Sequence, residues 1–115
     1  MKTTAHSNNN DQTQQLTIGE AYRRAVNHFH AENHLEAEKI CTAIIQAVPN
    51  HIDAINLLGV VAKQTNRHTL AIEQFQRAIN IDDNRAQLYF NLGTSLDQLG
   101  HREEAIQVLK TAQNK

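Results

Sequence analysis

The stretch that decides the fold is residues 86–112, AQLYFNLGTSLDQLGHREEAIQVLKTA. It aligns without a gap onto residues 52–78, IDAINLLGVVAKQTNRHTLAIEQFQRA, 34 positions earlier. A third and weaker copy begins at Ile18, again 34 positions earlier. A fixed period of this length is typical of repeat proteins, in which each unit is one supersecondary motif. The chain therefore divides into repeats at 18–51, 52–85 and 86–115.

Equivalent positions of the three repeats carry the same kind of residue. Position eight is small, position twenty is alanine and position twenty-four is apolar. These three columns are Ala25, Gly59 and Gly93; Ala37, Ala71 and Ala105; and Cys41, Phe75 and Leu109. Position seven is leucine in the second and third repeats but Arg24 in the first. Small residues at positions eight and twenty predict two helices in close contact, because larger side chains would hold the backbones apart.

This interpretation of the alanine column makes a testable prediction. We expect Ala71→Leu to lower the melting temperature, since overpacking a helix contact typically costs about 1–3 kcal/mol. We expect Ala31→Leu, outside the columns, to leave the melting temperature nearly unchanged. Thermal unfolding followed by circular dichroism measures both, and similar melting temperatures for the two variants would contradict the interpretation.

Each repeat carries two runs with the apolar spacing of an amphipathic helix. In the second repeat these runs include Ile55 to Ala62 and Ala71 to Ile79, and the polar residues 64–68, QTNRH, separate them. Asn66 and Gly100 are expected to take the left-handed conformation that ends a helix. Thr69 is expected to cap the helix that follows. The sequence thus predicts three helix-turn-helix units.

The columns resemble those of the tetratricopeptide repeat family, whose pattern has Leu-Gly at positions seven and eight and alanine at twenty and twenty-seven. The likeness covers about residues 16–115 and is strongest in the third repeat, whereas the first keeps Ala37 and Pro49 but loses the Leu-Gly pair. It implies an all-α superhelix, or solenoid, of three antiparallel hairpins. The second and third repeats are also similar to the bacterial arrays that precede the catalytic domains of O-GlcNAc-transferase-like glycosyltransferases.

Composition excludes several classes of protein. Eleven basic residues balance 12 acidic ones, so the chain lacks the basic excess that duplex nucleic acid requires. No apolar run approaches the ~20 residues of a membrane span. Cys41 is the single cysteine and cannot form an internal disulfide. Residues 1–15 are polar and aperiodic, unlike a secretory signal, and we expect a disordered tail. Together these features predict a soluble, cytoplasmic protein that binds neither nucleic acid nor membrane.

No catalytic constellation is evident, and we expect no enzyme activity, no cofactor and no metal site. The phosphate-binding glycine loops and the zinc motifs are absent from the sequence. His30 and His34 share a helical face, but no third ligand completes a site. Cys41 occupies an apolar column, which favours a buried, inert thiol. The adjacent carboxylates Glu103 and Glu104 point in different directions on a helix. We therefore expect them to be solvated surface groups rather than an acid–base pair.

The family resemblance implies that the first helices of successive hairpins line a concave groove that holds a peptide or partner protein. Tyr22 and Phe90 would be anchors of the type enriched at binding hot spots. Asn56 and Asn91 would bond a peptide backbone, since an amide both donates and accepts. The predicted groove residues are Tyr22, Arg23, Val26, Asn56, Val60, Lys63, Phe90, Asn91 and Thr94, within a wider set that includes Leu57 and Gln87.

One subfamily binds the carboxylate tails of chaperones through a clamp of lysine, asparagine and arginine. The matching positions here are Tyr22, Val26, Leu57, Gln87 and Asn91. None of them carries the clamp residue, so a chaperone-tail adaptor is not expected.

Three functions are consistent with the sequence: a protein-binding scaffold, an accessory segment of a glycosyltransferase system, and a self-assembling structural unit. The last predicted helix ends with the chain and exposes a side that would normally pack on another helix, near Ile106, Leu109 and Ala112. Self-association through this side would explain it, and so would an origin as the arm of a longer protein.

Overall fold

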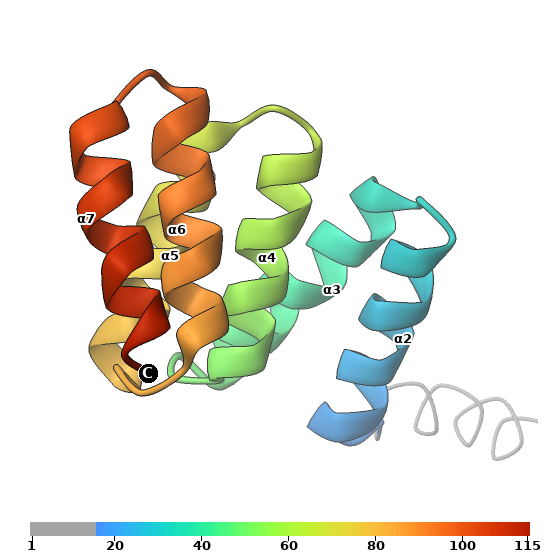
Figure 1. Ribbon diagram of the computed structural model, residues 1–115. Coiled ribbons are helices and arrows are strands. Elements are labelled where there is room, and N and C mark those ends of the chain that lie inside the picture. The colour runs from blue at the N-terminus through green and yellow to red at the C-terminus, as the bar shows by residue number, and fades with distance from the viewer. Residues whose placement is uncertain (1–15) are drawn as a thin grey trace, which may run out of the picture.

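The computed structural model describes residues 16–115, which form six α-helices, labelled α2 to α7 (Figure 1). The predicted disordered tail, residues 1–15, lies outside the described residues. The helices are α2 (Ile18–His30), α3 (His34–Ala47), α4 (Ile52–Gln64), α5 (His68–Ile81), α6 (Ala86–Gln98) and α7 (Arg102–Gln113). Both series of helix starts, 18, 52 and 86 and then 34, 68 and 102, keep the 34-residue period. The all-α prediction of three hairpins is confirmed.

The hairpins stack in chain order, and each helix packs against its neighbours in sequence (Figure 1). The first helices of the hairpins also contact one another, α2 with α4 and α4 with α6. The second helices, α3, α5 and α7, make no comparable contacts among themselves within the described residues. The stack therefore curves toward the side of α2, α4 and α6, which we call the inner side.

The small-residue columns lie where two helices of one hairpin meet. A Cβ atom built on Gly59 would lie 2.6 Å from the Phe75 ring, and one on Gly93 would lie 2.7 Å from the Leu109 side chain. Positions eight and twenty-four of a repeat are thus packing partners. In the first hairpin the equivalent pair is Ala25 and Cys41. The cysteine side chain is smaller than those of Phe75 and Leu109, and the residue opposite it is alanine instead of glycine.

The leucine column packs between hairpins. Leu58 belongs to a buried cluster with Ala25 and Cys41 of the preceding hairpin, and Leu92 belongs to one with Ala71 and Phe75. No hairpin precedes the first within the described residues, and Arg24 at the same position is exposed. The departure of Arg24 from the column therefore follows from its place at the end of the stack.

All three hairpin turns have the same backbone conformation. Glu32, Asn66 and Gly100, which are 34 residues apart, have φ angles of 63°, 64° and 86°. The next backbone N–H closes each helix, as from Arg67 to the Ala62 carbonyl at 2.7 Å. The predictions for Asn66 and Gly100 are confirmed, and Glu32 takes the same conformation.

The prediction that Thr69 caps α5 is wrong. The helix begins at His68 and its N-cap is Arg67, which forms no side-chain cap. The left-handed residue at position fifteen turns the chain directly into the next helix. One residue is left between Asn66 and α5, and Thr69 already lies inside the helix. By contrast, Thr17 and Glu20 form a full capping box at the start of α2.

Candidate functional site

A chain of amide groups crosses the inner side from α6 to α4. The Gln87 Nε2 donates to the Asn91 Oδ1 at 3.0 Å. The Asn91 Nδ2 then donates to the Asn56 Oδ1 at 3.2 Å. Helical periodicity places Gln87 and Asn91, four residues apart, on one face of α6, while Asn56 comes from the neighbouring hairpin. We call these three residues the amide chain.

A lysine and an aromatic ring lie on the same face of α6 and α4. The Lys63 Nζ donates to the Thr94 Oγ1 at 2.6 Å and lies 5.8 Å from the centre of the Phe90 ring. Burial lowers the pKa of Lys63. No carboxylate within the described residues forms an ion pair with this ammonium group. Lys63 thus presents a partly desolvated positive charge that is neutralised by no neighbour.

This face offers four kinds of contact to a ligand: a hydrogen-bond donor, an acceptor, an aromatic ring and the Lys63 cation. The Asn56 Nδ2 is a donor at one end of the amide chain, and the Gln87 Oε1 is an acceptor at the other. Neither atom has a hydrogen-bond partner among residues 16–115. The Phe90 side chain is 50% exposed, an unusual state for a large apolar group. Donor, acceptor, ring and cation together suit a polypeptide more than a small apolar ligand.

Five of the nine predicted groove residues therefore lie together, namely Asn56, Lys63, Phe90, Asn91 and Thr94. Val60 lies on the same helix as Lys63 but is partly buried against the core between hairpins two and three. Gln87, which belonged only to the wider predicted set, completes the amide chain.

The three predicted residues on α2 form a separate group. Tyr22, Arg23 and Val26 line a surface hollow of about 510 Å³ on α2. The Tyr22 ring packs against the His51 ring with centroids 5.7 Å apart, and burial raises the pKa of Tyr22. Val26 packs against the core of the first two hairpins, while Arg23 is exposed. Within residues 16–115, no hydrogen bond joins these α2 residues to the amide chain.

Position six of the repeat departs from the expected groove pattern. Leu57 is only 7% exposed and packs in the core with Ala25 and Cys41, so its assignment to the groove is wrong. Asn91, at the same position of the next repeat, is 6% exposed. Both side chains point toward the preceding hairpin. The buried Asn91 amide is accordingly bonded to Gln87 and Asn56 rather than open to solvent.

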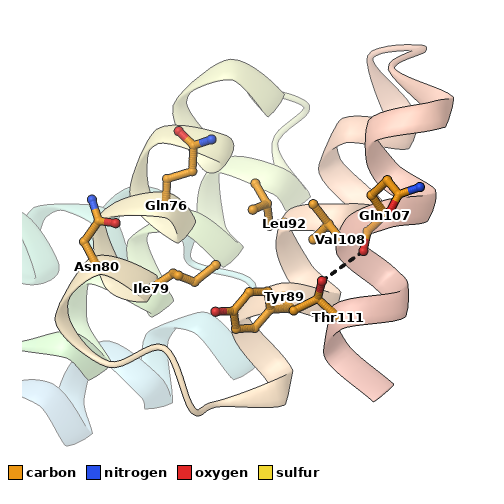
Figure 2. A pocket seen from close by; sticks show the side chains of 8 residues that line it. All are labelled: Gln76, Ile79, Asn80, Tyr89, Leu92, Gln107, Val108 and Thr111. Carbon is orange, nitrogen blue, oxygen red and sulfur yellow. Dashed lines mark hydrogen bonds between the residues drawn. The ribbon is translucent and has the colours of Figure 1, made fainter. Parts of the chain in front are cut away.

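A second hollow, of about 370 Å³, lies on the opposite face of α6 (Figure 2). Ile79, Leu92 and Val108 supply its apolar part, and amide and hydroxyl side chains line the rest. The full lining is Gln76, Ile79, Asn80, Tyr89, Leu92, Gln107, Val108 and Thr111, with the Thr111 Oγ1 donating to the Gln107 carbonyl at 3.1 Å. No sequence argument predicted this hollow, because it forms only where α5, α6 and α7 meet.

The structure gives no catalytic role to the remaining candidates. Cys41 is fully buried, and burial raises the pKa of its thiol to about 12, so it is an inert core residue as predicted. His30 and His34 flank the Phe29 ring. No three histidine, cysteine or acidic side chains of residues 16–115 converge on a metal position. Over the same range, no helix has the length and apolar character to cross a bilayer.

Comparison with known proteins agrees with the repeat pattern. The sequence profile of the TPR repeat matches residues 59–100. Over 89 residues the chain is 28% identical to the UDP-N-acetylglucosamine–peptide N-acetylglucosaminyltransferase of Caenorhabditis elegans, covering 77% of this chain and 8% of that enzyme. The O-GlcNAc transferase of Thermobaculum terrenum is similar at 27% identity with a TM-score of 0.80, covering 83% of this chain and 18% of that one.

The fold is also that of MamA, with a TM-score of 0.81 and 23% identity over 85% of this chain and 57% of MamA. The chain spans less than two thirds of the length of each of these relatives. Six helices in three hairpins, a 34-residue period and the profile match lead to one conclusion. Residues 59–100 match the tetratricopeptide repeat, and the three hairpins of residues 16–115 form a TPR superhelix that is similar to the repeat region of O-GlcNAc transferases and, in its fold, to MamA.

Proposed function

We propose that this chain is a non-catalytic protein-binding module that holds an extended peptide segment on its inner side. The observation that carries the proposal is the amide chain of Gln87, Asn91 and Asn56, next to the half-exposed Phe90 ring. Tetratricopeptide modules typically serve as protein-interaction scaffolds, and this face has the chemistry for that role. The partner would be recognised by its backbone and by a few side chains.

Each peptide unit of an extended ligand carries one donor and one acceptor. The Asn56 Nδ2 can donate to a ligand carbonyl, and the Gln87 Oε1 can accept from a ligand N–H. These contacts read the backbone rather than the side chains, so they tolerate many sequences. Asn91 fixes the orientation of both amides through its own two hydrogen bonds.

Lys63 and Phe90 would add selectivity to this contact. A ligand carboxylate near Lys63 would compensate the partly desolvated ammonium group, and a charge-assisted hydrogen bond of this kind is stronger than a neutral one. An apolar ligand side chain would cover the exposed Phe90 ring. We therefore expect the bound peptides to carry an acidic residue beside an apolar one. Tyr22, Arg23 and Val26 would extend the contact onto the first hairpin, and the setting we propose is the cytoplasm of a bacterium.

The test is selection from a displayed peptide library against three purified proteins. The first is the wild type, and the second carries Asn56→Ala and Phe90→Ala on the inner side. The third is a matched control with Gln76→Ala and Asn80→Ala on the opposite face. Circular dichroism first establishes that all three have the same helix content and melting temperature.

We expect the wild type and the control to enrich the same peptides, and the inner-side variant to bind them at least about tenfold more weakly. A Lys63→Met variant should lose the preference for acidic residues while keeping the apolar one. If the inner-side variant enriches the same peptides with the same affinity, the ligand does not bind on this face and the proposal is wrong.

Similarity to two O-GlcNAc transferases favours a second candidate function. In that case the same face would present acceptor proteins to a glycosyltransferase that is encoded elsewhere or in a further part of the protein. A transferase gene beside this one, together with selected peptides that contain serine or threonine at a fixed position, would favour this candidate over a general scaffold.

A further inference from the structure

The two ends of the stack expose different chemistry. At the first end, the outward face of α2 carries Glu20, Arg23, Arg24 and Asn27, all exposed. The equivalent positions of α4 and α6 pack against the preceding hairpin and include Leu58 and Leu92. The α2 face is therefore polar where an internal repeat would be apolar. Beside this face, an apolar hollow of about 320 Å³ lies between α2 and α3, lined mainly by Leu16, Ile18, Ala21, Ile40, Ala43 and Ile44.

The other end is apolar. A hollow of about 450 Å³ between α6 and α7 is lined mainly by Phe90, Leu109 and Ala112, with Ala86, Gln87 and Gln113 at its edge. Ile106 beside it is 45% exposed. The equivalent residues of the second hairpin, Phe75 and Ala78, are fully buried, because α6 covers them. This end face thus has the shape and character of a surface that receives a helix.

The charges bordering this face indicate which helix fits. Ile106, Leu109 and Gln113 follow one stripe of α7 at helical spacing. Glu103 and Lys110, one heptad apart, lie along a single edge of that stripe. Both are exposed, and neither has an ion-pair partner among the described residues. An edge with an acid at one end and a base at the other is complementary to itself when two copies run antiparallel.

We propose that two copies of this chain pair tail to tail through α7, related by a twofold axis that passes beside Ile106. In this arrangement Glu103 of each copy faces Lys110 of the other, so the charge pair forms twice. The two Ile106 side chains meet at the axis and shield Leu109. The interface uses the same patch on both copies and is closed, as in most homodimers.

A head-to-tail assembly is disfavoured by the exposed arginines on the outward face of α2. It would press Arg23 and Arg24 of one copy onto the apolar hollow of the next. Burying an unpaired guanidinium group against apolar side chains is costly. The two arginines of α2, rather than a lack of apolar surface at that end, therefore favour a dimer over an open filament.

The first test is a charge exchange, read by sedimentation velocity from low micromolar to submillimolar concentration. We expect the wild type to dimerise. Glu103→Lys or Lys110→Glu alone should raise the dissociation constant of the dimer at least about tenfold, because each substitution places two like-charged pairs in the interface. The double variant restores opposite charges and should recover the dimer. Arg24→Glu, at the other end of the stack, is the matched control and should leave the dissociation constant unchanged.

The second test places a thiol at the axis. Ile106→Cys should form an intermolecular disulfide under mild oxidation, whereas Leu35→Cys, exposed to 64% on α3, should not. Both positions are exposed, so neither change should unfold the protein, and the buried Cys41 does not compete.

A wild type that stays monomeric at every concentration would overturn the proposal, as would a double variant no better than the single ones. Larger assemblies lost with Arg24→Glu would indicate head-to-tail packing and would also overturn it. These outcomes are distinct from failure of the peptide-binding proposal, because Asn56→Ala should leave dimerisation intact.

Discussion

At the scale of single residues, the three left-handed turn positions of the repeats carry glutamate, asparagine and glycine in succession. Glycine accepts a positive φ angle freely, asparagine tolerates it, and glutamate is strained there. The strain at Glu32 could not be recognised from its residue type. The period of 34 identifies it, because Asn66 and Gly100 occupy the same position.

Relief of this strain should stabilise the protein. We expect Glu32→Gly to raise the free energy of unfolding by about 0.5–1 kcal/mol, because the left-handed penalty exceeds the added freedom of glycine in the unfolded chain. Chemical denaturation measures the change. The control is Glu36→Gly in the first turn of α3, which should destabilise the protein, and an equal loss for both variants would contradict the explanation.

The contact between positions eight and twenty-four leaves no room for one methyl group in the second hairpin. We expect Gly59→Ala to destabilise the protein, because overpacking costs about 1–3 kcal/mol and the better helix propensity of alanine, about 1 kcal/mol, offsets only part of it. The loss should shrink in a Phe75→Cys background, which copies the Ala25 and Cys41 pair of the first hairpin. Equal losses in both backgrounds, measured by a double-mutant cycle, would show that Phe75 is not the obstacle.

At the scale of elements, a forked ion pair ties the first hairpin to the second. The Arg67 guanidinium, in the turn before α5, donates to both oxygens of Glu38 on α3 at 3.1 and 2.6 Å. These hydrogen bonds lower the pKa of Glu38. Because the pKa of Glu38 is lower in the folded state than in the unfolded chain, the ion pair contributes its full stabilisation at pH values above the unfolded-state pKa of glutamate, about 4.3.

This linkage predicts a pH-dependent effect of Glu38→Gln. At neutral pH the variant should lose about 0.5–1 kcal/mol of unfolding free energy, the range of a well-formed surface pair. The difference from the wild type should vanish as pH falls below about 4 and through the folded pKa of Glu38, because the wild-type carboxyl is then protonated too. Denaturation curves at a series of pH values measure it, and a difference that persists in acid would assign the loss to packing instead.

At the scale of the whole molecule, stability is distributed along a one-dimensional stack. The buried clusters lie between successive hairpins, and the second hairpin contributes to all three of them. Only this hairpin is covered on both sides by other described helices. In such an array stability is close to a sum of unit and interface contributions, so the ends open first.

Native-state hydrogen exchange should follow this order. We expect the amides of α4 and α5 to exchange with the highest opening free energy and those of α2 and α7 with the lowest. Leu92→Ala, which weakens the interface between the second and third hairpins, should speed exchange in α6 and α7 more than in α2 and α3. Uniform acceleration across all six helices would mean that the stack unfolds as one unit.

The sequence by itself determined the period, the six helices, the hairpin pairing and the left-handed turns. These depend on spacing within about 34 residues and on residue types with strong local preferences, such as the alanine column and Gly100. Tertiary structure alone decided which side chains meet across hairpins. The Asn91–Asn56 and Lys63–Thr94 contacts, the burial of Leu57 and the open hollow beside Phe90 all depend on how one hairpin is rotated against the next. That rotation depends on the packing of many side chains at once, so no single residue or motif in the sequence predicts it.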